Sequence, residues 1–218
     1  MWNTRDICEH AAEALREEAA RRDAEQSPYG LDSLEEVALH PIIAAGLRRH
    51  DLGVHAEQRY PSHRARRNRS QGDRCDLVVT SRPDDHLIDP LAADTLFGDR
   101  GATPSEALWI EIKTAHQFAL TDGAAGPGSS YSAEMLSLAT ADLRKLARGG
   151  ELGGSALLLA MFNADESVAR HDLDAWLHRC LDQGIPIISV QAERFEITDR
   201  IGNTCCTTAL IGVRPDAE

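Results

Sequence analysis

The chain has 218 residues, of which 42% are hydrophobic and 27% charged, and these ordinary globular proportions exclude a disordered, collagenous or repeat-built protein. Its apolar runs are shorter than the roughly 18 residues of a membrane-spanning helix, and its acidic, helix-like opening is not that of a signal peptide. We therefore expect a cytoplasmic protein with no membrane partner. The five cysteines, an odd number without C-x-x-C spacing, are expected to be small core or surface residues rather than a disulfide framework or zinc ligands.

The formal net charge is −12, which argues against a protein that coats nucleic acid non-specifically. The charge is uneven, because residues 59–74 contain six arginines and one acid, so this window carries +5 and the rest of the chain −17. One interpretation is a solvated loop that balances an acidic body, and the other is a loop that contacts phosphates. In the second interpretation the substrate-binding residues are Arg64, Arg66, Arg67, Arg69 and Arg74.

The first half of the chain predicts two helices and three strands. A helix is expected over residues 4–25 with Thr4 as its N-cap, and a second helix begins near Ser33, where apolar residues follow a 3.6-residue period. Alternating and apolar runs then predict strands at residues 54–60, 74–79 and 107–113. The Pro-, Asp- and Gly-rich residues between the second and third strands predict a long connection.

The second half of the chain alternates helices and strands. Residues 121–130 predict a mobile loop because they are rich in Gly and Ser, and a helix over residues 131–148 follows. After it we expect a buried strand, a helix and two hairpin strands, at residues 155–162, 173–181, 185–197 and 204–213. This order predicts an α/β fold, a mixed central sheet with helices on both sides.

The third predicted strand carries two charged residues on one face. Side chains alternate along a strand, so Glu111 and Lys113 lie opposite the apolar residues Ile110 and Ile112. A strand this apolar should be central in the sheet, and buried charges must pair or bind a ligand. Lysine is also scarce, because Lys113 and Lys145 are the only lysines among 23 basic residues. Because every other basic position is an arginine, the two lysines indicate a need for a compact ammonium at these positions.

A structural salt bridge between Glu111 and Lys113 is one interpretation of this strand. Residues i and i+2 are about 7 Å apart, however, so a third group that bridges the two is easier to accommodate. Asp76 leads into the neighbouring strand, and its carboxylate can converge with that of Glu111 on one hard cation such as Mg²⁺. Lys113 would then orient or deprotonate a water beside the ion. This layout is typical of phosphodiester hydrolysis.

An acidic residue enters one strand and an E-x-K sequence lies within the next. With these features the chain resembles the PD-(D/E)xK nuclease superfamily, also called the restriction-endonuclease-like fold, whose core runs α-β-β-β-α-β. The resemblance covers residues 33–162, and its motif residues are Asp76, Glu111 and Lys113. The proline that names the motif is absent before Asp76, and the 34 residues between Asp76 and Glu111 imply an insertion. The expected layout is one domain with an N-terminal helical extension, a core with an insertion, and a C-terminal helix with strands, over residues 1–30, 31–165 (insertion 81–106) and 166–218.

Further site residues are implied by the resemblance. Many members place a glutamate in the first core helix, where Glu36 is the best match and Glu35 stays open, and a basic residue in the helix after E-x-K, where Lys145 matches. Glu36 also follows Ser33 at the S-x-x-E spacing of a capping box, which would exclude it from the site. Likewise, Asp142 and Lys145 are spaced to pair along one helix.

The resemblance implies a nuclease that depends on Mg²⁺ (or Mn²⁺) and acts on DNA. The implied metal ligands are Asp76, Glu111 and the backbone carbonyl of Ile112, and the implied catalytic and phosphate-contacting residues are Asp76, Glu111, Lys113, Glu36 and Lys145. Gln117 is a further candidate for phosphate contact because it follows the E-x-K strand. Surface placement without a role is the alternative for Gln117. The alternative for the whole chain is a catalytically silent module of the same fold that binds nucleic acid or a protein partner. The oligomeric state is open, with a homodimer among the alternatives.

Overall fold

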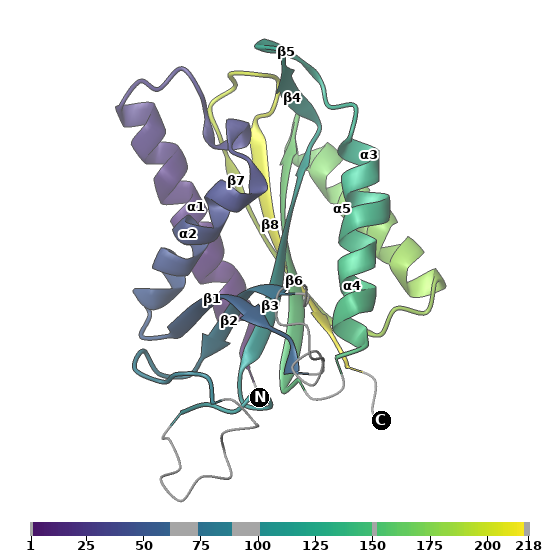
Figure 1. The fold of residues 1–218 in the computed structure, drawn as a ribbon. Coiled ribbons are helices and arrows are strands. Elements are labelled where there is room, and N and C mark those ends of the chain that lie inside the picture. The colour runs from purple at the N-terminus through teal and green to yellow at the C-terminus, as the bar shows by residue number, and fades with distance from the viewer. Residues whose placement is uncertain (1, 62–73, 89–100, 150–151, 216–218) are drawn as a thin grey trace, which may run out of the picture.

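The protein is built around one six-stranded sheet with the strand order β1-β2-β3-β6-β8-β7 (Figure 1). In this computed structural model, β3 and β6 run parallel, and the other neighbouring strands of the sheet run antiparallel. The strands span Gly53–Arg59 (β1), Arg74–Thr80 (β2), Leu108–His116 (β3), Gly154–Asn163 (β6), Ile187–Glu196 (β7) and Cys205–Val213 (β8).

The structure describes residues 2–61, 74–88, 101–149 and 152–215. Four of the arginines that are predicted to contact phosphates lie outside the described residues. They are Arg64, Arg66, Arg67 and Arg69. Residues 89–100 of the predicted insertion lie outside them as well. Within the described ranges, none of the helices combines the length and the apolar character needed to cross a membrane.

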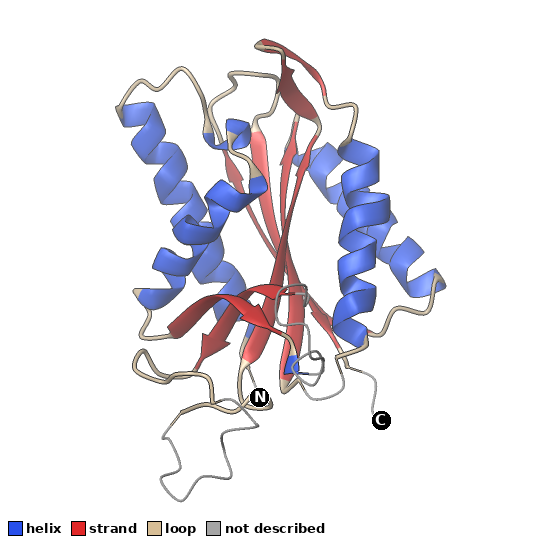
Figure 2. Cartoon of the chain, in the orientation of Figure 1, coloured by secondary structure: helices blue, strands red, loops and turns tan. Residues whose placement is uncertain are grey.

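Helices cover both faces of the sheet (Figure 2), which confirms the predicted mixed α/β architecture. The first face packs against α1 (Thr4–Ala24) and α2 (Glu36–Arg48), and a short 3₁₀ helix, η1 (Leu31–Ser33), connects them. The second face packs against α5 (Glu166–Asp182) and a composite helix. This composite helix consists of α3 (Tyr131–Ala133), a π-helical segment η3 (Glu134–Ala139) and α4 (Thr140–Ala147). Two apolar cores therefore lie on either side of the sheet.

The predicted starts of two helices were wrong, in both cases because of a local capping group. The N-cap of α1 is Asn3 rather than Thr4, since the Asn3 side chain accepts a hydrogen bond from the Arg5 amide. Helix α5 begins at Glu166, well before the predicted residue 173, because the Asp165 side chain accepts from the Val168 amide and fixes the first turn there.

The predicted mobile loop at residues 121–130 was also wrong. Most of it belongs to a hairpin of β4 (Phe118–Thr121) and β5 (Ala124–Pro127). The two residues between these strands, Asp122 and Gly123, both have positive φ angles, of 51° and 80°. An Asp-Gly pair in this conformation favours a tight hairpin turn, which the Gly- and Ser-rich composition obscured.

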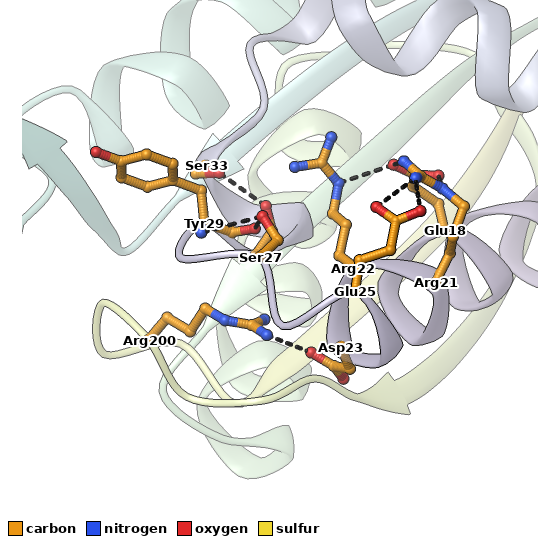
Figure 3. Close-up of polar contacts among 10 residues, drawn as sticks. Glu18, Arg21, Arg22, Asp23, Glu25, Ser27, Tyr29, Ser33 and Arg200 are labelled. Carbon is orange, nitrogen blue, oxygen red and sulfur yellow. Dashed lines mark hydrogen bonds and ion pairs between the residues drawn. The ribbon is translucent and has the colours of Figure 1, made fainter.

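The C-terminal strands β7 and β8 form the predicted hairpin across Gly202. Their connection is held to the end of α1, where the Arg200 guanidinium lies 2.7 Å from the Asp23 carboxylate (Figure 3). The Thr198 hydroxyl donates a second hydrogen bond to Asp23. These contacts join the first helix and the last hairpin, which are far apart in the sequence.

Candidate metal-dependent active site

The site lies where β2 and β3 separate. Their backbone pairing covers only three residue pairs and ends at Leu77 and Ile110. Beyond that point the Asp76 side chain replaces a backbone acceptor, because its Oδ2 accepts a hydrogen bond of 2.7 Å from the Ile112 amide. The separation opens a gap in the sheet and aligns the Asp76 carboxylate beside the E-x-K segment of β3. Burial raises the pKa of Asp76, although the Ile112 amide opposes the shift.

Glu111 lies on β3 next to Asp76 and is almost completely buried, with 3% of its surface exposed. The Tyr60 hydroxyl donates to its Oε1, and the Lys145 ammonium lies 2.8 Å from the same oxygen. Burial is the main cause that raises the pKa of Glu111, and the negative charge of Asp76 adds to it. Glu111 is thus a carboxylate held in place by two donors and crowded by a second carboxylate.

Lys113 follows Glu111 on β3 and is surrounded by oxygen atoms. Its Nζ lies 2.7 Å from Glu36 Oε1 and 3.4 Å from Asp142 Oδ2, and it donates a 3.0 Å hydrogen bond to the Ile112 carbonyl. Burial lowers the pKa of Lys113, but the neighbouring carboxylates outweigh it, so the net shift is upward. The ammonium is therefore held in its charged form.

The capping-box interpretation of Glu36 was wrong. Helix α2 begins at Glu36, and Ser33 belongs to η1, where its hydroxyl donates to the Gly30 carbonyl (Figure 3). The Glu36 side chain instead points to β3, where Oε2 accepts from the Thr114 amide at 3.2 Å and Oε1 contacts Lys113. Glu36 therefore lies beside Lys113 and does not cap the helix.

Lys145 comes from α4, on the second face of the sheet, and reaches the same site. Besides Glu111, it contacts the Arg74 carbonyl at 3.2 Å, and its Nζ lies 4.9 Å from the centre of the Tyr60 ring. Asp142, one turn earlier on α4, contacts Lys113. The expected pairing of Asp142 with Lys145 along the helix was wrong, because each side chain reaches across to a partner on β3.

Two predicted contact residues lie apart from this cluster. The Gln117 side chain accepts a hydrogen bond from the Ala164 amide at 2.9 Å, so its oxygen is bonded to the loop after β6. Arg74 is exposed at the start of β2, and its backbone carbonyl accepts a hydrogen bond from Lys145.

Sequence reasoning missed three residues at the site: Tyr60, Asp142 and His40. Tyr60 directly follows β1 and stacks on Trp109, with 5.4 Å between the ring centres. His40 lies on α2 one turn after Glu36, and burial lowers its pKa. The spacing of His40 from Glu36 on a helix was the available signal, since residues four apart share a face.

The charges of the site fit a divalent cation. Among the described residues, four carboxylates (Asp76, Glu111, Glu36 and Asp142) face two ammonium groups, which leaves a formal surplus of two negative charges. Asp76 and Glu111 each have one oxygen occupied by a protein donor, at Oδ2 and Oε1 respectively. Their second oxygens are hard donors of the kind that Mg²⁺ and Mn²⁺ prefer. The Ile112 carbonyl, the third predicted ligand, accepts from Lys113.

Comparisons of the chain with protein-family models, with curated proteins and with solved structures find no match. A functional assignment therefore depends on the chemistry of the site. The feature that most needs explanation is a buried and a half-buried carboxylate, Glu111 and Asp76, where two strands separate, with Lys113 and Lys145 close by.

Proposed function

We propose that the protein is a metal-dependent phosphodiester hydrolase, a nuclease that acts on DNA, with a restriction-endonuclease-like core. The observation that carries this proposal is the placement of Asp76, Glu111 and Lys113 at the point where β2 and β3 separate. The order of the elements supports it, since α2, β1, β2, β3, α4 and β6 follow one another as α-β-β-β-α-β, with the small β4–β5 hairpin inserted before the composite helix. The formal surplus of negative charge at the site also supports it.

Asp76, Glu111 and the Ile112 carbonyl would hold the ion. When bound there, a divalent ion would polarise a phosphoryl oxygen and lower the pKa of a water. Tyr60 and Lys145 keep the Glu111 carboxylate in position through its Oε1. Ion binding also relieves the repulsion between Asp76 and Glu111, since each carboxylate then faces a cation.

Lys113 would act on the reacting groups beside the ion. Its charged ammonium donates hydrogen bonds and cannot serve as a ligand. In the structure it is kept protonated by Glu36 and Asp142, so it can orient a water and stabilise the negative charge that develops on the phosphoryl oxygens. Glu36 sets the position of this ammonium through its 2.7 Å contact.

A silent module is the second candidate, and one observation favours it. Lys145 and Tyr60 already supply Glu111 with two donors, an arrangement that can stabilise a buried carboxylate without any metal. If this is its only role, the site is a structural ion-pair network and the protein should bind nucleic acid or another protein without cleaving a substrate.

Cleavage assays distinguish the two candidates. Plasmid DNA, single-stranded DNA and RNA are incubated with the protein in Mg²⁺, Mn²⁺ or EDTA. We expect metal-dependent cleavage of DNA, which Asp76→Ala and Glu111→Ala should each reduce on the order of 10³-fold, because loss of the ion withdraws several kcal/mol of transition-state stabilisation. Asp174→Ala, at an exposed position of α5, is the matched control. Full activity in either site variant, with the fold verified by circular dichroism, would refute the proposal.

A further inference from the structure

A second group of metal-ligating side chains lies on the other side of Asp76. His40 on α2, Glu57 on β1 and Asp76 on β2 each offer one ligand atom, and these atoms lie within 4.8 Å of one another. Helix α2 packs over β1 and β2, which places the imidazole above the two strands. The group thus combines one nitrogen and two carboxylate donors from three separate elements.

The strand register explains why the two carboxylates meet. Ala56 pairs with Leu77 and Gln58 with Cys75, so Glu57 lies opposite Asp76 on the neighbouring strand. Like charges directly opposite each other on paired strands destabilise a sheet. A cation between the two carboxylates would convert this repulsion into attraction.

The imidazole supplies the independent observation. His40 Nε2 is buried, and it has no hydrogen-bond partner among the described residues. A buried polar atom without a partner is costly, and a ring nitrogen is also one of the commonest metal ligands in proteins. A ligand atom of the His40 ring lies within 4.8 Å of ligand atoms from the exposed Glu57 and the half-buried Asp76, and a cation held among them would be a partner for all three groups.

We propose that His40, Glu57 and Asp76 form a second divalent-cation site, which shares Asp76 with the first and selects a transition ion of the first row over Mg²⁺. The selectivity follows from the donors, because imidazole nitrogen suits transition ions whereas Mg²⁺ prefers oxygen ligands and water. The inference deepens the proposed function through the shared Asp76, but it concerns binding and can be measured without cleavage.

A different histidine cluster must be removed before the test. His10, Glu13 and His50 also have ligand atoms within 4.8 Å of one another. The His10 and His50 rings are stacked, with centres 3.4 Å apart and planes 7° apart. Their ring nitrogens therefore point along parallel planes instead of converging on one point, so this cluster carries no proposal. It could still bind an added metal weakly, and His50→Ala provides a clean background.

The test counts Mn²⁺ ions bound to the His50→Ala protein by electron paramagnetic resonance, with and without a large excess of Mg²⁺. We expect one Mn²⁺ per chain to resist Mg²⁺. His40→Ala and Glu57→Gly should each weaken this Mg²⁺-resistant binding at least about tenfold, since even supporting residues of a metal site commonly contribute 10- to 100-fold. Glu111→Gln should leave it in place.

Glu57→Gly keeps the test decisive if His40→Ala destabilises the fold. Glu57 has a φ angle of 55°, a conformation that glycine adopts more readily than other residues, so this variant should fold at least as well. Unchanged Mg²⁺-resistant Mn²⁺ binding in Glu57→Gly, or no such binding in the parent, would overturn the inference. Mg²⁺-resistant binding without any nuclease activity would refute the proposed function alone, and nuclease activity without this binding would refute the second site alone.

Discussion

The two halves of the central sheet differ in how completely their strands pair. β6 forms nine successive residue pairs with β3 and nine with β8, and the side chains on both of its faces are buried and mostly apolar. β2 and β3, by contrast, form three pairs before they separate. Where they separate, the Asp76 carboxylate replaces a backbone carbonyl, and charged side chains occupy the space that apolar residues fill elsewhere.

This difference separates the residues that stabilise the fold from those that would perform chemistry. Apolar burial along β6 is favourable without any partner, whereas the buried Glu111 and the half-buried Asp76 are costly unless cations face their carboxylates. The half of the sheet around β2 is therefore expected to tolerate removal of its charges, and the half around β6 is not expected to tolerate removal of its methyl groups.

The largest effect on stability is expected from the fully paired half. Leu158 on β6 is completely buried in the core beneath α1 and α2. Leu158→Ala should lower the free energy of unfolding by about 2–5 kcal/mol, because it removes buried methyl groups and leaves a cavity. Urea denaturation measures this change, and Asp76→Asn is the counterpart in the other half. A greater decrease of stability in Asp76→Asn than in Leu158→Ala would contradict the division between the two halves.

The next effect concerns Lys113 and tests the chemistry of the half around β2. Lys113→Ala should slow cleavage on the order of 10²-fold, which is typical when one charged donor to a transition state is removed, and should leave metal binding intact. Lys113→Arg should also fail, since a planar guanidinium is bulkier and cannot place a compact ammonium between Glu36 and Asp142. Steady-state cleavage rates provide the measurement. Arg144→Ala on α4, at an exposed position, is the control.

An active Lys113→Arg variant would show that positive charge alone is required at this position. In that case neither proton transfer nor the shape of the ammonium would matter, and the role of Lys113 would be limited to charge compensation among Glu36, Asp142 and the substrate.

The same division explains which parts of the structure could be predicted from the sequence. Alternation along β3 was sufficient to place Glu111 and Lys113 together and to predict their burial, because strand periodicity is local. The scarcity of lysine pointed to Lys145, whose contact with Glu111 spans two elements. The paired strands and the helices on both faces followed from apolar periodicity, apart from shifts at capped ends such as Asp165.

The residues that were missed depend on tertiary packing. Tyr60 reaches Glu111 only because the residue after β1 packs on Trp109 of β3, and Asp142 reaches Lys113 only because α4 packs against the sheet. Ser33 and Glu36 fit a capping box by spacing, but the 3₁₀ turn of η1 removes Ser33 from the helix. None of these contacts has a signature in the spacing of neighbouring residues.

A smaller effect is expected in the pH dependence of stability. Burial raises the pKa of Asp76, so between the ordinary pKa and the raised one the folded protein binds more protons than the unfolded chain. Stability therefore falls as pH rises through this window, and the full penalty is present above it. Asp76→Asn cannot ionise, so it should have a higher Tm than the parent at pH 7–8, with the gain shrinking as the pH approaches 4.

Mg²⁺ provides the matched measurement. It should raise the Tm of the parent at pH 7–8 and have little effect on Asp76→Asn, because the ion compensates a charge that the variant lacks. If the Tm difference between the two proteins were independent of pH and Mg²⁺, the carboxylate of Asp76 would not be the group that destabilises this half of the sheet.

The smallest effect per residue is expected from the arginine-rich segment between β1 and β2. The rest of the chain carries −17 and would repel a polyanion, so a nucleic acid should first be held where the sign of the charge reverses. The segment enters β2 at Arg74, two residues before Asp76, and a phosphate bound there would be delivered close to the metal ligands. The segment is therefore expected to contribute to affinity for DNA through its charge.

Salt dependence measures this contribution. Replacement of Arg64, Arg66, Arg67 and Arg69 by alanine should reduce the slope of log affinity against log salt concentration by about 0.9 for each phosphate that the protein no longer neutralises. The weakening should be the same for all DNA sequences, because phosphates carry no sequence information. The control replaces four exposed arginines outside this segment, on α4, directly after it and on α5. These are Arg144, Arg148, Arg170 and Arg179. A slope that changes equally in both variants would assign the effect to net charge alone, and an unchanged slope in the first would identify the segment as a solvated loop.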